Sequence, residues 1–149
     1  MTEDIFDTLD LQADIGEIAS AMAWLEAIGE RDEWPARLNF SLGLGLDEAM
    51  TNIANYAFID HPVAEPRIHL RVGRHGNRVS VQIVDNGKAF DPTKFPPPEL
   101  AASLDEAEIG GHGMRLMLHY LDKIEYARVD DKNQLTLLAI LPSEFTQPE

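Results

Sequence analysis

The sequence predicts an α+β fold, a two-layer α/β sandwich with helices on one face of a mostly antiparallel, mixed sheet. Apolar residues recur at three and four positions within residues 14–58, which is typical of amphipathic helices. From Arg67 onward they alternate with polar residues, which is typical of strands covered on one face. Helices that bury one side against such a sheet form two layers. The 149 residues show no internal repeat and no linker, so we expect a single domain, 1–149.

The predicted elements begin with a strand and two helices. Residues 4–11 mix apolar and polar side chains and predict an edge strand. The first helical pattern covers 14–28, and Gly29 is its expected end. Trp34-Pro35 starts the second helix, because proline is tolerated in a first helical turn. The second pattern continues to about Phe58.

Two hairpins supply the remaining strands. Alternation over 67–85 is interrupted only by turn residues at 74–77, which predicts an antiparallel hairpin. Apolar runs at 123–129 and 134–141 predict a second hairpin around the turn 130–133.

The two hairpins are separated by a long loop and a helix. Residues 91–109 contain Pro92 and three consecutive prolines, followed by small and acidic residues, and so predict a loop of a length that often carries function. The apolar residues that follow predict a helix at about 112–121.

Composition limits the classes of partner and the expected compartment. A formal net charge of −14 argues against nucleic acid, which is bound by excess Lys and Arg. A polyphosphate ligand would therefore need a divalent cation or backbone amides. The absence of cysteine excludes disulfides and thiolate metal sites. No apolar run approaches the ~20 residues of a membrane helix, and the acidic N-terminus lacks the pattern of a secretion signal, so we expect a cytoplasmic protein.

Three polar residues form a stripe on the second predicted helix. Glu48, Asn52 and Asn55 have i, i+4, i+7 spacing and lie within about 60° of one another on a regular helix. Such a stripe is usually a solvated face. However, Asn has poor helix propensity, a side-chain carbonyl is a good ligand for hard cations, and a carboxylate can orient or deprotonate a hydroxyl. The stripe is therefore also a candidate site.

A second candidate lies at the end of the strand that precedes residue 86. Asp85 and Gly87 are compatible with a plain Asn-Gly turn. Alternatively, a buried Asp85 carboxylate could accept a hydrogen bond from an exocyclic amine such as adenine N6. Gly87 would let a ring approach the backbone, because glycine has no side chain.

A third candidate is the glycine-rich turn before the helix predicted at 112–121. Gly110, Gly111 and Gly113 could be a lid hinge or a simple turn. Free amides at a helix N-terminus also bind anions without any lysine, which would suit a chain so short of cations.

These three segments, in this order, resemble the motifs of the Bergerat-fold ATPase superfamily, which includes gyrase-type topoisomerases, a heat-shock chaperone, mismatch-repair ATPases and sensor histidine kinases. E-x-x-x-N at Glu48 and Asn52 resembles the superfamily's N box. D-x-G-x-x-F-D over 85–91 resembles the adenine-binding box. G-x-G at Gly111 and Gly113 resembles the box that wraps phosphate.

Within the superfamily, TNIANYAF, DNGKAFDP and GGHGMRLM are similar to the anti-sigma-factor serine/threonine-protein kinases of bacterial partner-switching systems. The resemblance implies a protein that binds ATP and sequesters a sigma factor or another output protein. It further implies phosphorylation of a serine on an anti-anti-sigma antagonist of the STAS type, and a possible homodimer. Sensor histidine kinases fit less well, because the sequence offers no candidate for their phospho-accepting dimerisation helices.

The resemblance also implies roles for individual residues. Glu48 would be the general base or the carboxylate that orients the hydroxyl, and Asn52 would hold Mg²⁺ bound with ATP. Asp85 would bind adenine N6, with Gly87 beneath the ring. The segment 91–109 would be the ATP lid. The expected ATP-binding residues are Asn52, Asn55, Asp85, Gly87, Gly111 and Gly113.

Two features depart from the family's pattern. Ala89 stands where many members have a second glycine, although the serine-kinase branch commonly has this form. The stretch 92–109 has Lys94 as its only cation and no arginine. Its acids are Glu99, Asp105, Glu106 and Glu108.

Three functions follow as hypotheses. The first is a protein-serine kinase, which Glu48 favours because nucleotide binding alone does not need that carboxylate. The second is a non-catalytic, nucleotide-gated protein-interaction module, which the acidic lid favours. The third is an ATP-binding domain that serves a larger regulator in trans.

Overall fold

The computed structural model of the chain describes residues 5–93 and 121–141. Most of the predicted lid (91–109), Gly110, Gly111, Gly113 and the predicted helix at 112–121 lie outside these residues. The described elements are β1 (Ile5–Gln12), the 3₁₀ turn η1 (Ile15–Glu17), α1 (Ile18–Arg31), α2 (Ala36–Asn52), the π-helical turn η2 (Ile53–Ala57), β2 (Arg67–His75), β3 (Arg78–Asp85), β4 (Lys123–Val129) and β5 (Lys132–Ile140).

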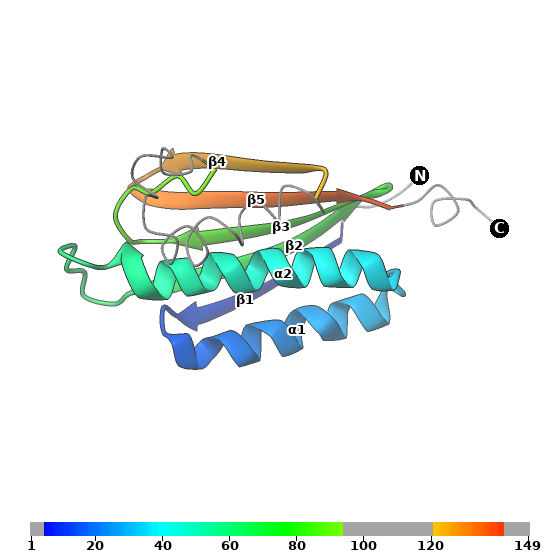
Figure 1. Cartoon of the computed structure of the whole chain (residues 1–149), viewed down its shortest axis with the longest axis horizontal. Coiled ribbons are helices and arrows are strands. Elements are labelled where there is room, and N and C mark those ends of the chain that lie inside the picture. Colours follow the sequence, from blue (N-terminus) through cyan, green and yellow to red (C-terminus); the bar gives the residue numbers. More distant parts are fainter. Residues whose placement is uncertain (1–4, 94–120, 142–149) are drawn as a thin grey trace, which may run out of the picture.

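The five described strands form one sheet in the order β1-β2-β3-β5-β4, and every neighbouring pair is antiparallel. Helices α1 and α2 run side by side along the sheet, and α2 contacts both β3 and β5 (Figure 1). The predicted α+β class, the edge position of the first strand and both hairpins are confirmed.

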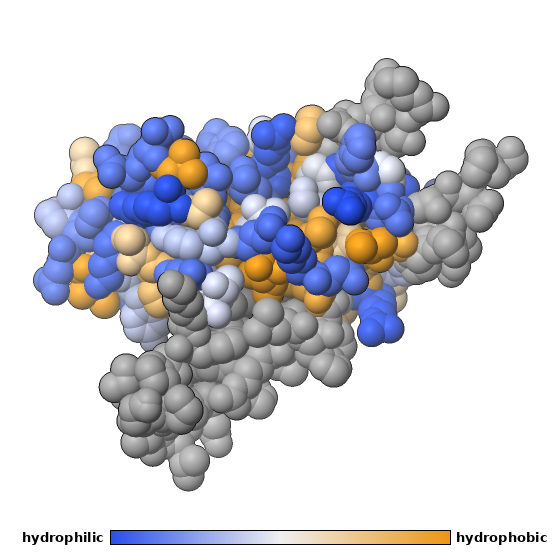
Figure 2. Space-filling view, turned by 90° about the horizontal axis from the view of Figure 1, so that it is seen from above, coloured by the Kyte–Doolittle hydropathy of each residue, from blue (hydrophilic) through white to orange (hydrophobic). Residues whose placement is uncertain are grey.

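The core lies between the two helices and one face of the sheet. Alternate residues of β2, β3 and β5 are buried, as the two-residue period requires. Leu42, Leu46 and Met50 of α2 are fully buried against this face. The coloured surface in Figure 2 is mainly hydrophilic, with apolar residues in small separate groups. Among the described residues, no helix is both long and apolar enough to cross a membrane.

Two predicted boundaries are wrong. Gly29 does not end the first helix, which continues to Arg31. A Cβ atom at residue 29 would lie 2.0 Å from Asn39 Oδ1 and 3.0 Å from Trp34 Cε3, so the glycine allows α2 to pack closely on α1. The second hairpin turn is shorter than 130–133, because only Asp130 and Asp131 adopt positive φ and β5 already begins at Lys132.

The second predicted helix is confirmed in extent but not in regularity. It is α-helical to Asn52 and then forms the π turn η2, which ends at Ala57. Single π turns within helices are often found at functional sites. Here the change occurs directly after a predicted site residue.

Candidate functional site

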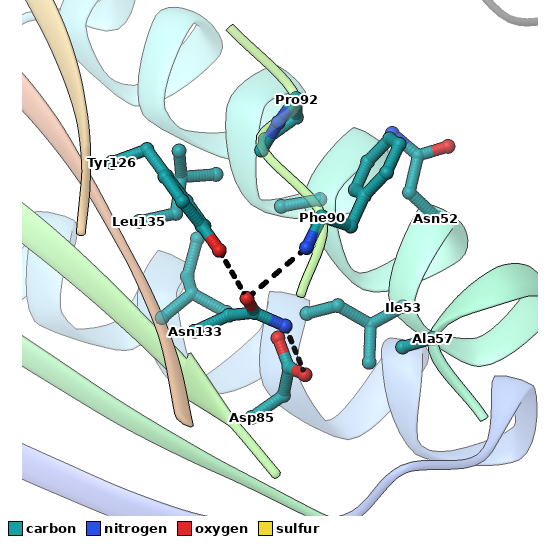
Figure 3. Close-up of a pocket in the computed structure, with 11 residues that line it drawn as sticks. Asn52, Ile53, Ala57, Asp85, Phe90, Pro92, Tyr126, Asn133 and Leu135 are labelled. Atoms are coloured by element: carbon teal, nitrogen blue, oxygen red, sulfur yellow. Dashed lines mark hydrogen bonds between the residues drawn. The ribbon is translucent and has the colours of Figure 1, made fainter. Parts of the chain in front are cut away.

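A hollow of about 390 Å³, partly open to solvent, lies between the end of α2 and the inner face of the sheet. Its lining is mostly apolar with a few polar groups, which is the chemistry typical of small-molecule sites. The residues around it come from α2, η2, β3, β4, β5 and the segment after β3, and Figure 3 shows them converging on the hollow. The lining residues are Ala49, Asn52, Ile53, Ala57, Ile83, Asp85, Phe90, Pro92, Tyr126, Asn133 and Leu135.

Asp85 is the buried carboxylate of this pocket. It is the last residue of β3 and only 4% of its surface is exposed. Its Oδ1 accepts hydrogen bonds from the Gly87 amide at 2.8 Å and from Asn133 Nδ2 at 3.0 Å. Burial raises the pKa of Asp85, while these two hydrogen bonds and the charges of Arg128 and His61 act in the opposite direction. Among the described residues no donor reaches Oδ2, which leaves that oxygen for a ligand.

Asn133 is a pocket residue that the sequence analysis assigned to a turn. It lies in β5 directly opposite Asp85 and is 5% exposed. Its Nδ2 donates to Asp85 and, at 2.8 Å, to the Lys88 carbonyl. The alternation of Asn133 with Leu135 and Leu137 was the signal that could have placed it on the buried face.

Gly87 lies where β3 leaves the sheet beside η2. A Cβ atom there would be 2.6 Å from Ala57 Cβ and 2.7 Å from the Ala57 carbonyl oxygen. The next residue, Lys88, donates its amide to that same carbonyl at 2.8 Å. Glycine is therefore required at this position by contact with η2, a reason that the sequence did not reveal.

The side chain of Asn86 links the end of β3 to the backbone before and at the start of β2. Its Oδ1 accepts from the Arg67 amide and its Nδ2 donates to the Glu65 carbonyl, each at 2.9 Å. The Asn-Gly pair therefore does more than make a turn, because the asparagine side chain fastens the end of β3 to the start of β2.

Glu48 and Asn52 are adjacent, as their helical spacing predicted. Asn52 lines the pocket, and its Nδ2 donates to Glu48 Oε2 at 3.3 Å. Burial raises the pKa of Glu48, the hydrogen bond from Asn52 lowers it, and the Asp47 charge raises it. A carboxylate with a raised pKa is a stronger proton acceptor near neutral pH. Because Asn52 donates through nitrogen, its oxygen is available to a hard cation such as Mg²⁺.

The structure does not bring Asn55 to the described pocket. The residue is exposed on η2 and is not among the lining residues. The predicted stripe assumed regular α-helical spacing, which the π turn alters after Asn52. Glu48 does not line the pocket either and reaches it only through Asn52. The glycines Gly111 and Gly113 lie outside the described residues, so their expected phosphate contacts remain predictions.

The described groups can bind a flat heteroaromatic ligand that carries an amine. Ile53, Ile83 and Leu135 supply apolar walls, and Asp85 supplies a buried acceptor at the base. Asn52 lies on the helix at the other side of the pocket, next to the half-buried carboxylate of Glu48. A base-reading group and a cation-binding group are thus both present at one hollow.

Two comparisons with known proteins show what this chain is similar to. A family model described as histidine kinase-like ATPase domain matches residues 11–139. The chain is also 48% identical over 132 residues to "Serine/threonine-protein kinase BtrW" of Bordetella bronchiseptica, which covers 88% of this chain and 91% of that protein. The family match includes all three segments that the sequence analysis singled out.

Proposed function

Because this chain belongs to the family of histidine kinase-like ATPase domains, we propose that it is an ATP-dependent protein-serine kinase acting as an anti-sigma factor in a partner-switching system. The kinase activity is supported by the family match and by the name of the 48% identical relative. The proposed substrate is a serine of a STAS-type anti-anti-sigma antagonist. The proposed output partner is a sigma factor or another regulatory protein that the kinase sequesters.

The observation that carries the proposal is the Glu48–Asn52 pair beside a pocket with Asp85 at its base. In the proposed complex, Asp85 accepts a hydrogen bond from adenine N6, and the apolar walls exclude water from the ring. Phosphoryl transfer needs mainly positioning and charge neutralisation. The Asn52 oxygen is the proposed protein ligand of Mg²⁺, which would neutralise phosphate charge when bound with ATP.

Glu48 is the proposed proton acceptor. The serine Oγ forms a bond to the γ-phosphorus of ATP as the bond between that phosphorus and the leaving ADP oxygen breaks. The hydroxyl proton passes to Glu48, so the products are phosphoserine and ADP. The position of Glu48 supports this role, because Asn52 holds its carboxylate beside the pocket.

A phosphorylation assay with radiolabelled ATP, Mg²⁺ and candidate antagonist domains tests this function. We expect Glu48→Gln to reduce phosphoserine formation by about a hundredfold or more while ATP affinity stays near that of the wild type. Glu26→Gln is the matched control, because Glu26 is exposed on α1 and lies outside the pocket.

Transfer at the wild-type rate by the Glu48→Gln variant would exclude the role of Glu48. Wild-type protein that binds ATP yet phosphorylates no antagonist would favour the alternative, a non-catalytic module gated by nucleotide. The acidic composition of residues 92–109 is the observation that favours this alternative.

A further inference from the structure

Asn133 contacts both the carboxylate of the pocket and the chain segment that follows it. It is buried in β5, and hydrogen bonds to both the nitrogen and the oxygen of its side-chain amide restrict the rotation of that amide. Its oxygen accepts from the Tyr126 hydroxyl, from Arg128 Nη1 at 3.1 Å and from the Phe90 amide at 3.3 Å. Figure 3 shows the Tyr126 and Phe90 donors meeting on this one oxygen.

The three donors fix which way the Asn133 amide points. An oxygen turned toward Asp85 would face another acceptor, while the nitrogen would face three donors. The nitrogen must therefore face Asp85, and it donates to Oδ1 at 3.0 Å. The donors from described residues thus engage Oδ1, and Asp85 Oδ2 is left as an acceptor for a ligand.

The same side chain fastens the segment after β3. Asn133 donates to the Lys88 carbonyl at 2.8 Å and accepts from the Phe90 amide, while Arg128 donates to the Gly87 carbonyl at 2.8 Å. Residues 87–90 are thus held to the β4–β5 hairpin at three backbone groups, which are the carbonyls of Gly87 and Lys88 and the amide of Phe90. This segment carries Phe90 into the pocket wall.

We propose that Asn133 is a positioning residue for the nucleotide, which holds Asp85 as an oriented acceptor and fixes residues 87–90 beside it through one amide. The inference rests on the proposed function, since it assumes that Asp85 binds adenine. The charged groups that act on Asp85 from neighbouring elements are Arg128 of β4 and His61 after η2.

Asn133→Asp tests this role, because the new side chain can donate to Asp85 only when it is protonated. At low pH one proton shared by the two carboxyls restores the missing donor. At high pH two adjacent carboxylates repel, and the Asp85 acceptor is displaced. A merely structural role would weaken ATP binding at every pH by a similar factor.

The measurement is the ATP dissociation constant at pH 6.0 and pH 8.5, with the fold verified by circular dichroism at both values. Gln134→Asp is the matched control, because it adds the same charge at the next position of β5 on the opposite face of the sheet. We expect the affinity of Asn133→Asp to fall by about tenfold more than that of the control between these pH values.

Each outcome bears on the role of Asn133 or on the proposed function. A pH profile of Asn133→Asp that parallels that of Gln134→Asp overturns the inference and leaves the proposed function standing. Wild-type protein that binds no ATP at either pH rejects the proposed function and this inference with it. If Asn133→Asp does not fold, Tyr126→Phe decides instead, since it removes only one donor to the Asn133 oxygen. We expect a rise of about 2–10-fold in the dissociation constant, and wild-type affinity would refute the role.

Discussion

Replacing Gly87 by alanine adds one methyl group at a crowded position between Ala57 and Asp85. The new Cβ would lie 2.6 Å from Ala57 Cβ, 2.7 Å from the Ala57 carbonyl oxygen and 2.9 Å from Asp85 Oδ1. Ala57 is buried, and its carbonyl already accepts from the Lys88 amide. These clashes can be removed only by movement of the Ala57 backbone or of the hydrogen-bonded Asp85 carboxylate, because none of the contacting atoms is the end of a long, flexible side chain.

The expected cost follows from these contacts. Overpacking of this kind destabilises proteins by about 1–3 kcal/mol. Alanine also lowers the conformational entropy of the unfolded chain, which offsets roughly 0.4–1 kcal/mol of this destabilisation. We expect a net loss of about 1–2 kcal/mol in the free energy of unfolding, together with weaker ATP binding because Asp85 is displaced.

Urea unfolding followed by far-ultraviolet circular dichroism measures this loss. Gly16→Ala is the control, since the nearest atoms to a Cβ there belong to Asp14 and lie at 3.9 Å or more. The control should stay within about 0.5 kcal/mol of the wild type. Equal midpoints for Gly87→Ala and Gly16→Ala would refute the argument that contact with η2 requires glycine at residue 87.

Two further predictions concern the polar groups of the pocket. Asn52→Ala should raise the Mg²⁺ concentration needed for ATP binding, because it removes the oxygen proposed for the cation, and an unchanged metal titration would remove Asn52 from the site. Asp85→Asn should cost adenine recognition about 1–3 kcal/mol through a mismatched buried polar group. Calorimetry that finds an unaltered preference for ATP over GTP in this variant would contradict the assignment.

Periodicity predicted most of this fold because the buried faces repeat within each element. Ile68, Leu70 and Val72 share one face of β2, and this face packs toward the helices as the two-residue alternation indicated. The helical spacing likewise identified the buried side of α2, where Leu46 and Met50 lie. Such patterns are local, so they could be read before any tertiary contact was known.

The errors arose where tertiary contact outweighs local preference. Gly29 was expected to end a helix, but its contact with Trp34 and Asn39 keeps it inside α1. Asn133 was grouped with the turn residues before it, although the two positive φ values at Asp130 and Asp131 already complete the turn. Residue preference alone predicts neither outcome, although the alternation of Asn133 with Leu135 and Leu137 was a local signal for the second.

The candidate site was predictable in its parts but not in its connections. Sequence spacing identified Glu48 and Asn52, and the end of a strand identified Asp85. Asn52 and Asp85 line the pocket, and Glu48 contacts it through Asn52. Asn133 reaches Asp85 through strand pairing between residues 48 positions apart, which no local pattern encodes. The π turn that separates Asn55 from the pocket was equally hidden.

Binding of adenine nucleotide at Asp85, in the pocket between α2 and the sheet, is the proposal on which the other nucleotide-binding predictions depend. Nuclear magnetic resonance of the ¹⁵N-labelled protein during titration with Mg²⁺ and ADP tests it directly. We expect shifts in the side-chain amide signals of Asn133 and Asn52 and in the backbone amide signal of Gly87. The side-chain signal of Asn77, in the β2–β3 turn, should stay in place. Unchanged signals from Asn133 and Gly87 at saturating nucleotide would contradict it.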